Sequence, residues 1–256
     1  MSDLLTLSLG TLILRPYVFV FLAVYLAAAS WDLGLRRALA FTGWAWAVAF
    51  LAELSSTRTG IPFGLYHYTE VTRGQELFLA NVPLMDSLSF TFLAYASFCL
   101  ARLCFGRGPA VVFPAGLLMM LLDVVIDPLA VRGDRWFLGQ IFYYPEGGVY
   151  FGVPLSNFLG WAVVGWVIVG GFAWLTGEAR HPRGGVALYY GVLAFNLAVT
   201  WWIGEYALLA AGLALHAALA AGLRAIANAL SARGVTARSS AGLAGAPLGG
   251  GVGRGA

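Results

Sequence analysis

The sequence predicts an all-α fold, a polytopic transmembrane helical bundle of about seven spans. Of its 256 residues, 60% are hydrophobic and only 11% are charged, whereas soluble domains average about 25% charged residues. The apolar residues gather in runs of about 20, the length that crosses the hydrocarbon core of a bilayer as a helix. The expected spans are Pro16–Trp31, Ala38–Leu54, Val82–Leu103, Ala110–Val131, Val153–Leu175, Val186–Ile203 and Tyr206–Ile226.

The limits of the first and sixth spans are the least obvious. Spans six and seven are nearly continuous, and we divide them at Gly204-Glu205. Trp201-Trp202 is typical of a membrane interface, and a glutamate is costly at the bilayer centre. The start of the chain resembles a signal peptide around Arg15. The segment before that arginine is already apolar and offers no basic n-region, so we expect an uncleaved first span.

Charge placement predicts the orientation of the chain. The net charge is +3, and every basic residue apart from three histidines is an arginine. Ten arginines fall in the first, third and fifth loops and the C-terminal segment, against five on the other side. The positive-inside rule then places the C-terminus in the cytoplasm and the N-terminus outside. The arginines are scattered, so we expect no nucleic-acid partner. Residues 1–230 are expected to form one transmembrane domain, followed by a disordered Gly/Ala/Ser-rich tail, 231–256.

An acidic pair lies inside the fourth apolar run. Asp123 and Asp127 are four residues apart, which places both on one face of a helix. Pro128 is expected to end or kink that helix. A charged residue at the bilayer centre costs at least about 2.5 kcal/mol on insertion scales. Two acids this close interact strongly, so one is expected to hold a proton near neutral pH and to act as a proton donor. The alternative is a structural pair satisfied by backbone donors or by arginine.

Several polar residues fall at one level of the predicted bundle. Each lies toward the non-cytoplasmic end of its span, at the end that the two longest loops, 55–81 and 132–152, also cover. Polar groups that meet at one depth of a membrane bundle indicate a functional site. These residues are Glu53, Asp86, Asp123, Asp127, Asn157 and Glu205.

A second polar segment follows span two. Glu53 and Arg58 could form an ion pair, which would lower the cost of burying either. Tyr66 and His67 follow in a turn-rich stretch and could orient a substrate or water. The alternative is a helix end with an interfacial Tyr/His cluster. Further along, Asn196 is expected to form a helix–helix hydrogen bond rather than to bind a ligand.

A metal site is the rival interpretation of the Asp-x-x-x-Asp spacing. Magnesium favours carboxylates combined with substrate phosphates, and membrane aromatic prenyltransferases use aspartate-rich helices in this way. This chain has a single such pair and no lysine to meet a diphosphate. We therefore expect no metal.

Three segments carry a family resemblance. They are ELSSTRTGIPFGLYHYTE (53–70), LLDVVIDPLAVR (121–132) and YFGVPLSNFLGW (150–161). Together they resemble the membrane-integral carotenoid 1′,2′-hydratases, a group of carotenoid biosynthesis proteins. With the span pattern, the resemblance extends over roughly residues 38–204. The three segments are specific in combination, whereas any one alone would not be.

The resemblance implies a hydro-lyase of the bacterial cytoplasmic membrane. Its reaction would add water across the terminal C1′,2′ double bond of an acyclic (ψ) carotenoid end, as in lycopene or a monocyclic carotene. The implied partners are the carotenoid, water and the lipid bilayer, with contacts to other carotenoid-pathway enzymes also compatible. No cofactor is required. The expected acid/base residues are Asp123, Asp127 and Glu53, with Arg58, Tyr66, His67, Asp86, Asn157 and Glu205 orienting substrate, water or the acids.

Two other functions remain open. Membrane lycopene cyclases share a Val-Pro-Leu turn that opens a helix, but their turn continues with paired glutamates, where this chain has Ser156 and Asn157. This difference counts against ring closure, although a cyclase or isomerase would use the same proton chemistry. A carotenoid-binding or transport protein is the third reading, since intramembrane acids also serve proton-coupled transport. The lack of an internal sequence repeat argues against it.

Overall fold

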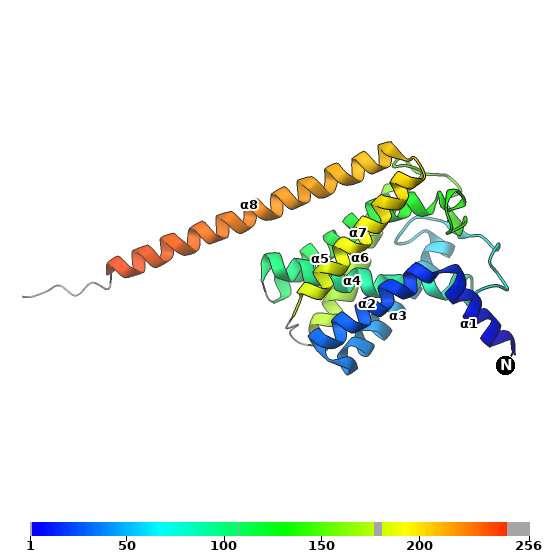
Figure 1. Cartoon of the computed structure of the whole chain (residues 1–256), viewed down its shortest axis with the longest axis horizontal. Coiled ribbons are helices and arrows are strands. Elements are labelled where there is room, and N and C mark those ends of the chain that lie inside the picture. Colours follow the sequence, from blue (N-terminus) through cyan, green and yellow to red (C-terminus); the bar gives the residue numbers. More distant parts are fainter. Residues whose placement is uncertain (1, 107, 177–180, 245–256) are drawn as a thin grey trace, which may run out of the picture. The chain divides into compact units, whose positions relative to one another are not determined.

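The computed structural model describes residues 2–106, 108–176 and 181–244, and its elements are almost entirely helical (Figure 1). The all-α prediction is confirmed. The chain divides into two compact units, residues 1–215 and 216–256, each described by itself. The helices are α1 (Ser2–Leu14), α2 (Pro16–Leu33), α3 (Leu35–Thr59), α4 (Leu84–Phe105), α5 (Val112–Ala130), α6 (Leu155–Thr176), α7 (Arg183–Trp202) and α8 (Tyr206–Ala244), with 3-10 turns at Pro109–Val111 and Gly133–Arg135.

Seven of these helical segments are long and apolar enough to cross a membrane, as the hydropathy pattern predicts. The division between the last two spans is also confirmed, because α7 ends at Trp202 and α8 begins at Tyr206. The apolar segment before Arg15 forms the separate short helix α1. Pro128 does not end α5, which continues to Ala130. Pro128 removes a single backbone N–H, and α5 extends only two residues beyond it.

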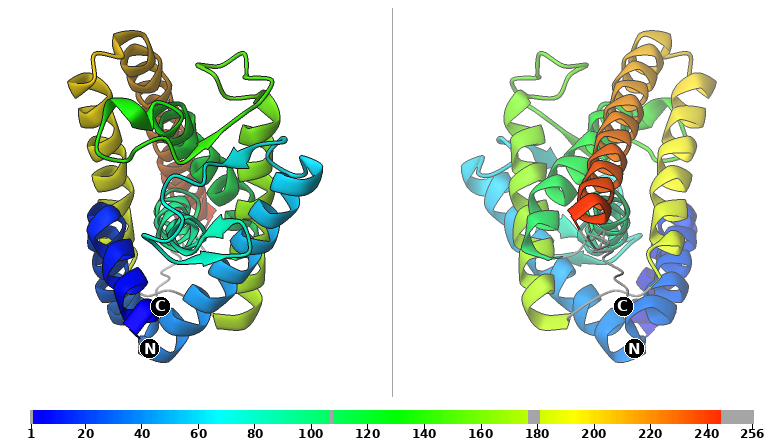
Figure 2. Two further views of the ribbon diagram at one scale, coloured as in Figure 1. Left: turned by 90° about the vertical axis from the view of Figure 1, so that its right-hand side faces the viewer. Right: turned by 90° about the vertical axis from the view of Figure 1, so that its left-hand side faces the viewer.

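The first unit is a bundle built around α4. Every residue of α4 from Phe90 to Ala101 is buried, and Figure 2 shows this helix enclosed by its neighbours. The most extensive helix–helix packing joins α5 to α6. It depends on small residues, since a Cβ added at Gly165 would lie 3.0 Å from the Cα of Gly116. Small residues at such crossings let the backbones of membrane helices approach closely.

Two long loops, 60–83 and 131–154, cover one end of the bundle. They are joined by the antiparallel pairing of β1 (His67–Tyr68) with β4 (Phe142–Tyr143). Beside this ladder, the hydroxyl of Thr69 donates to the carbonyl of Gln140 at 2.6 Å. A second two-stranded ladder, β2 (Phe78–Leu79) with β3 (Val82–Pro83), leads into α4.

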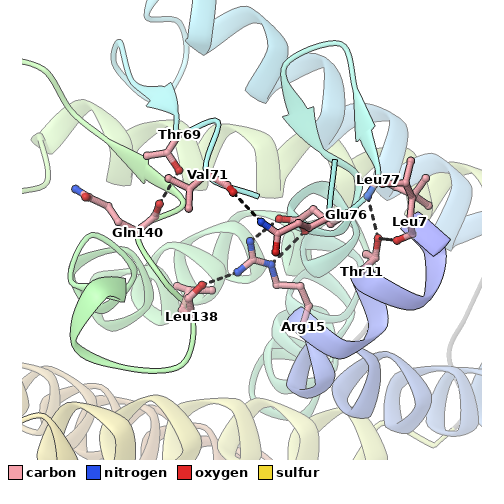
Figure 3. Close-up of polar contacts among 10 residues, drawn as sticks. Leu7, Thr11, Arg15, Thr69, Val71, Glu76, Leu77, Leu138 and Gln140 are labelled. Atoms are coloured by element: carbon pink, nitrogen blue, oxygen red, sulfur yellow. Dashed lines mark hydrogen bonds and ion pairs between the residues drawn. The ribbon is translucent and has the colours of Figure 1, made fainter. Parts of the chain in front are cut away.

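A buried ion pair ties the N-terminal segment to both loops (Figure 3). Arg15, between α1 and α2, lies 2.7 Å from an oxygen of Glu76 and donates to the carbonyl of Leu138 at 2.9 Å. Both side chains are almost fully buried. Burial lowers the pKa of Arg15, but the charges of Asp86 and Glu76 outweigh it and raise that pKa overall. Arg15 therefore stays charged and holds the covering loops in place.

The second unit contains the continuation of α8, which is helical through Ala244. The predicted tail begins at Ser231 and so overlaps the end of this helix. Residues 245–256 lie outside the described part of the chain. The division of the chain at residue 230 and the disorder of the tail stay predictions.

Candidate active site

A cavity lies at the loop-covered end of the bundle, between α2, α3, α4, α5, α6, α7 and the two loops. Its empty volume is about 900 Å³, including the open space at its mouth. The walls are mostly apolar and rich in aromatic residues; Phe90 and Trp161, for example, stack with ring centroids 4.1 Å apart. The polar residues in its walls are Glu53, Asp86, Ser89, Asp127, Asn157 and Asn196.

The acidic pair of α5 is joined by an amide from α6. The Nδ2 of Asn157 donates to Oδ2 of Asp123 at 2.7 Å and to Oδ2 of Asp127 at 2.8 Å. Asp127 lines the cavity, whereas Asp123 lies one turn away and is fully buried. The remaining oxygen of Asp123, Oδ1, has no hydrogen-bond partner among the described residues. The two acids therefore have different environments: one faces the cavity and the other is enclosed behind it.

A second acidic cluster lies on α3 and α4. Glu53 accepts a hydrogen bond from the Tyr68 hydroxyl at 3.0 Å on one oxygen and from the Ser87 hydroxyl on the other. Tyr66 donates to the Tyr68 hydroxyl at 3.4 Å, which extends the chain of hydroxyls. Asp86 also lines the cavity, and its buried Oδ2 lacks a hydrogen-bond partner within the described ranges. This cluster gives the cavity a second acidic wall.

The tyrosines of this cluster are hydrogen-bond donors. Burial, followed by the charge of Glu53, raises the pKa of Tyr66 and of Tyr68 well above the ordinary value. Both hydroxyls therefore keep their protons. Successive residues of a strand point to opposite faces; Tyr66 and Tyr68 line the cavity, whereas His67 is exposed and packs against Tyr143. The structure thus places His67 outside the cavity, contrary to its predicted role.

The predicted pairing of Glu53 with Arg58 is not formed. Arg58 is exposed at the end of α3, while Glu53 is buried and bonded to Tyr68 and Ser87. The physical reason is helical geometry: residues five apart point about 140° away from each other, at 3.6 residues per turn. Arg58 therefore has no contact through which to tune Glu53.

Glu205 also lies away from the cavity. It occupies the corner between α7 and α8, where it pairs with Arg132 at 3.1 Å and with Arg135. Burial raises the pKa of Glu205, but the charge and hydrogen bonds of the two arginines outweigh this and lower it. Glu205 is a charged partner for the loop after α5. The sequence predicts a place for Glu205 at the end of span six, but the direction of its side chain depends on these distant arginines.

Two residues of the site were not singled out by the sequence. Tyr68 and Ser87 hold Glu53, and strand alternation from Tyr66 was the available signal for Tyr68. Asn196 lines the cavity and donates to the carbonyl of Val192 in its own helix at 2.9 Å. This corrects the expected helix–helix hydrogen bond. Within the described chain, no three His, Cys, Asp or Glu side chains are grouped to hold a metal ion.

Comparison with known proteins gives two matches. The sequence profile of a family described as carotenoid biosynthesis protein matches residues 13–226. The chain is also 34% identical over 121 residues to the bisanhydrobacterioruberin hydratase of Haloarcula japonica. That alignment covers 46% of this chain and 38% of the relative, so the chain spans well under two thirds of the relative's length. No solved structure gives a significant match.

Proposed function

Since the chain belongs to the carotenoid biosynthesis protein family, we propose that it is a hydro-lyase that adds water to the terminal C1′,2′ double bond of an acyclic carotenoid end. The observation that carries the proposal is an aromatic cavity with two separate acidic walls, Asp127 with Asn157 on one and Glu53 with Asp86 on the other. Hydration of an alkene needs one group that gives a proton and another that accepts one from water. The hydratase named among the relatives supports the same chemistry.

In the proposed reaction, Asp127 starts from its acid form. Its proton forms a new C–H bond at C2′ and leaves a tertiary cation at C1′. Phe90 and Trp161 line the cavity, and aromatic faces attract cations by about 0.5–2 kcal/mol. Asp123 is fully buried behind Asp127 and cannot touch the substrate. Its proposed role is to return a proton to Asp127, its neighbour in the pair that Asn157 holds together.

The second acidic wall completes the addition. A water molecule held by Asp86 or Glu53 attacks C1′ and forms the C–O bond of a tertiary alcohol. Its released proton passes to the carboxylate that held it. The unpartnered oxygen of Asp86 is free to accept that hydrogen bond, while Tyr68 and Ser87 fix Glu53 in place. The proton that Asp86 or Glu53 accepts returns through cavity water to the acids of α5 before the next turnover. The sum of these steps is one water added, with no oxidation or reduction.

The rest of the cavity suits an apolar polyene. The walls from α2, α4 and α7 present Phe21, Phe92 and Phe195, and burying apolar surface contributes about 25 cal/mol per Å². The helices that carry these residues are membrane-spanning candidates. The carotenoid and the surrounding lipid are therefore the proposed partners of this surface.

The experiment that tests the proposal is pigment analysis in a lycopene-producing bacterial host that expresses this chain. We expect a product heavier by one water, with an unchanged visible chromophore. The Asp127→Asn variant should lose at least about 100-fold of the activity, because general acid catalysis contributes about 10²–10⁴-fold. Arg73→Gln, in an exposed ion pair with Glu70, is the matched control.

Three other results of this experiment would contradict the proposed function or the proposed acid. An isomeric product with a blue-shifted spectrum would indicate a cyclase. A pigment that copurifies with the protein but never changes mass would indicate binding or transport. Full activity of Asp127→Asn, at equal amounts of protein in the membrane, would remove Asp127 from the mechanism.

A further inference from the structure

The side chain of Arg132 joins three separate segments beside the acidic pair. Its Nη1 donates to the carbonyls of Pro128 and Phe151, each at 2.7 Å. Its Nε lies 3.1 Å from an oxygen of Glu205. The three partners belong to the end of α5, the turn before α6 and the α7–α8 corner. A planar guanidinium can hold several acceptors in fixed directions at once.

At the end of α5, Arg132 completes the hydrogen bonding of the helix. The last carbonyls of a helix have no partners within it. The carbonyl of Asp127 accepts from the backbone of Val131 at 3.0 Å, and that of Leu129 from the backbone of Arg132 at 3.1 Å. The carbonyl of Pro128 instead accepts from the Arg132 side chain. The peptide between Pro128 and Leu129, one residue after Asp127, is thereby fixed.

In the turn before α6, Arg132 holds an unusual backbone. Tyr150 and Val153 exchange two backbone hydrogen bonds of 3.2 and 2.9 Å. Between them, Phe151 has φ +50° and Gly152 has φ +91°. A non-glycine residue in this left-handed region costs on the order of 1 kcal/mol and persists only where its surroundings require it. Arg132 binds the carbonyl of Phe151 and lies 5.9 Å from its ring centroid.

We propose that Arg132 is a positioning residue that fixes Asp127 on α5 against Asn157 at the start of α6, with Glu205 orienting the guanidinium. The proposal rests on the function proposed for the site. Asn157 can bridge both acids at 2.7 and 2.8 Å only while the end of α5 and the start of α6 keep their register. Arg132 bonds to the backbone one residue after Asp127 and six residues before Asn157. It does not line the cavity.

The test is Arg132→Lys in the full-length protein, with Arg135→Lys as the matched control. Lysine keeps the charge, but its three donors lie on one nitrogen and lack the rigid planar fork that reaches acceptors on three separate segments. We expect kcat to fall about 10- to 100-fold, since misplacing a catalytic group by about 1 Å costs up to about 100-fold. KM should change by less than about 2-fold, because Arg132 makes no cavity contact.

The control variant separates the contacts of Arg132 with α5 and the turn from the ion pair with Glu205. Arg135 also pairs with Glu205, but it bonds to the carbonyl of Ile203 and not to α5 or the turn. Arg135→Lys should therefore keep both constants within about 2-fold of the unmodified protein, as rim ion pairs contribute little. Equal effects of the two lysine variants, or a raised KM with unchanged kcat in Arg132→Lys, would overturn the proposal.

A spectroscopic readout separates this proposal from the function itself. The infrared carboxyl bands of the acidic pair, assigned by subtraction of Asp127→Asn and Asp123→Asn spectra, report their hydrogen bonding to Asn157. We expect these bands to shift in Arg132→Lys and to stay in place in Arg135→Lys. If the unmodified protein adds no water to any carotenoid, the proposed function fails, and the infrared bands alone decide the positioning role. Unshifted bands in Arg132→Lys would refute it.

Discussion

Asn157 is the residue on which the geometry of the acidic pair depends. Its amide nitrogen carries two protons, and it donates to one oxygen of Asp123 and one of Asp127. The side chain is itself almost fully buried. A single neutral donor thus holds the two carboxyl groups together. Asparagine is suited to this position because a carboxylate there would add a third acid and supply no donor.

At the residue scale, we predict that Asn157→Asp abolishes pigment hydration and destabilises the protein by about 1–3 kcal/mol. Loss of a hydrogen bond to a buried polar group costs about that amount. Ser156→Ala, at the exposed neighbouring position, is the control. The measurements are product per unit of membrane protein and thermal unfolding in detergent. An active, equally stable Asn157→Asp variant would show that the acids do not need this amide.

The α5–α6 contact is the element on which the site is assembled. Asp123 and Asp127 lie on α5 and Asn157 on α6, so the separation of these helices sets their hydrogen-bond lengths. The two helices lie close together at Gly165, since a Cβ there would also lie 3.2 Å from the sulfur of Met119. Gly170, further along α6, would make only an ordinary contact of 3.7 Å with Val112.

At the element scale, we therefore predict opposite effects of two alanine substitutions on one helix. Gly165→Ala should destabilise the protein by about 1–3 kcal/mol through overpacking and reduce activity by separating Asn157 from the acids. Gly170→Ala should be neutral or stabilise by up to about 1 kcal/mol, through its higher helix propensity. Thermal unfolding and the hydration assay compare the two directly. Equal effects of Gly165→Ala and Gly170→Ala on stability and activity would contradict the close packing at Gly165.

At the scale of the whole bundle, the covering loops depend on the Arg15–Glu76 ion pair. Breaking a buried ion pair by removing one partner costs about 3–5 kcal/mol, because the other charge is left buried alone. Replacing both partners by apolar residues of similar size is often close to neutral. The two residues are 61 apart in the sequence, so the ion pair joins segments that are distant in the chain.

We accordingly predict that Arg15→Met lowers stability by about 3–5 kcal/mol and that adding Glu76→Leu recovers most of the loss. The measurement is thermal unfolding of both variants in the same detergent. The Leu138 carbonyl loses its donor in both variants, so the cost of that lost hydrogen bond is the same in each and does not affect the comparison. A double variant no more stable than Arg15→Met would mean that the arginine acts through Leu138 rather than through Glu76.

The sequence by itself determined the membrane fold, the limits of most spans and the family. Spans can be predicted from hydropathy because a bilayer requires about 20 apolar residues with internally satisfied backbones. Asp123 and Asp127 could be identified from the sequence because charged groups are costly inside a bilayer. The arginine count predicts an orientation, with the N-terminus outside, that stays a prediction.

The tertiary structure decided which polar residues meet. Asp127 faces the cavity and Asp123 does not, because α6 covers one side of α5 and supplies Asn157. Glu205 was expected at the site by its depth, yet Arg132 and Arg135 hold it at a corner. Depth in the membrane depends on local sequence, and so can be predicted from it. The direction in which a side chain points depends on helix rotation and on partners distant in the chain, which only packing fixes.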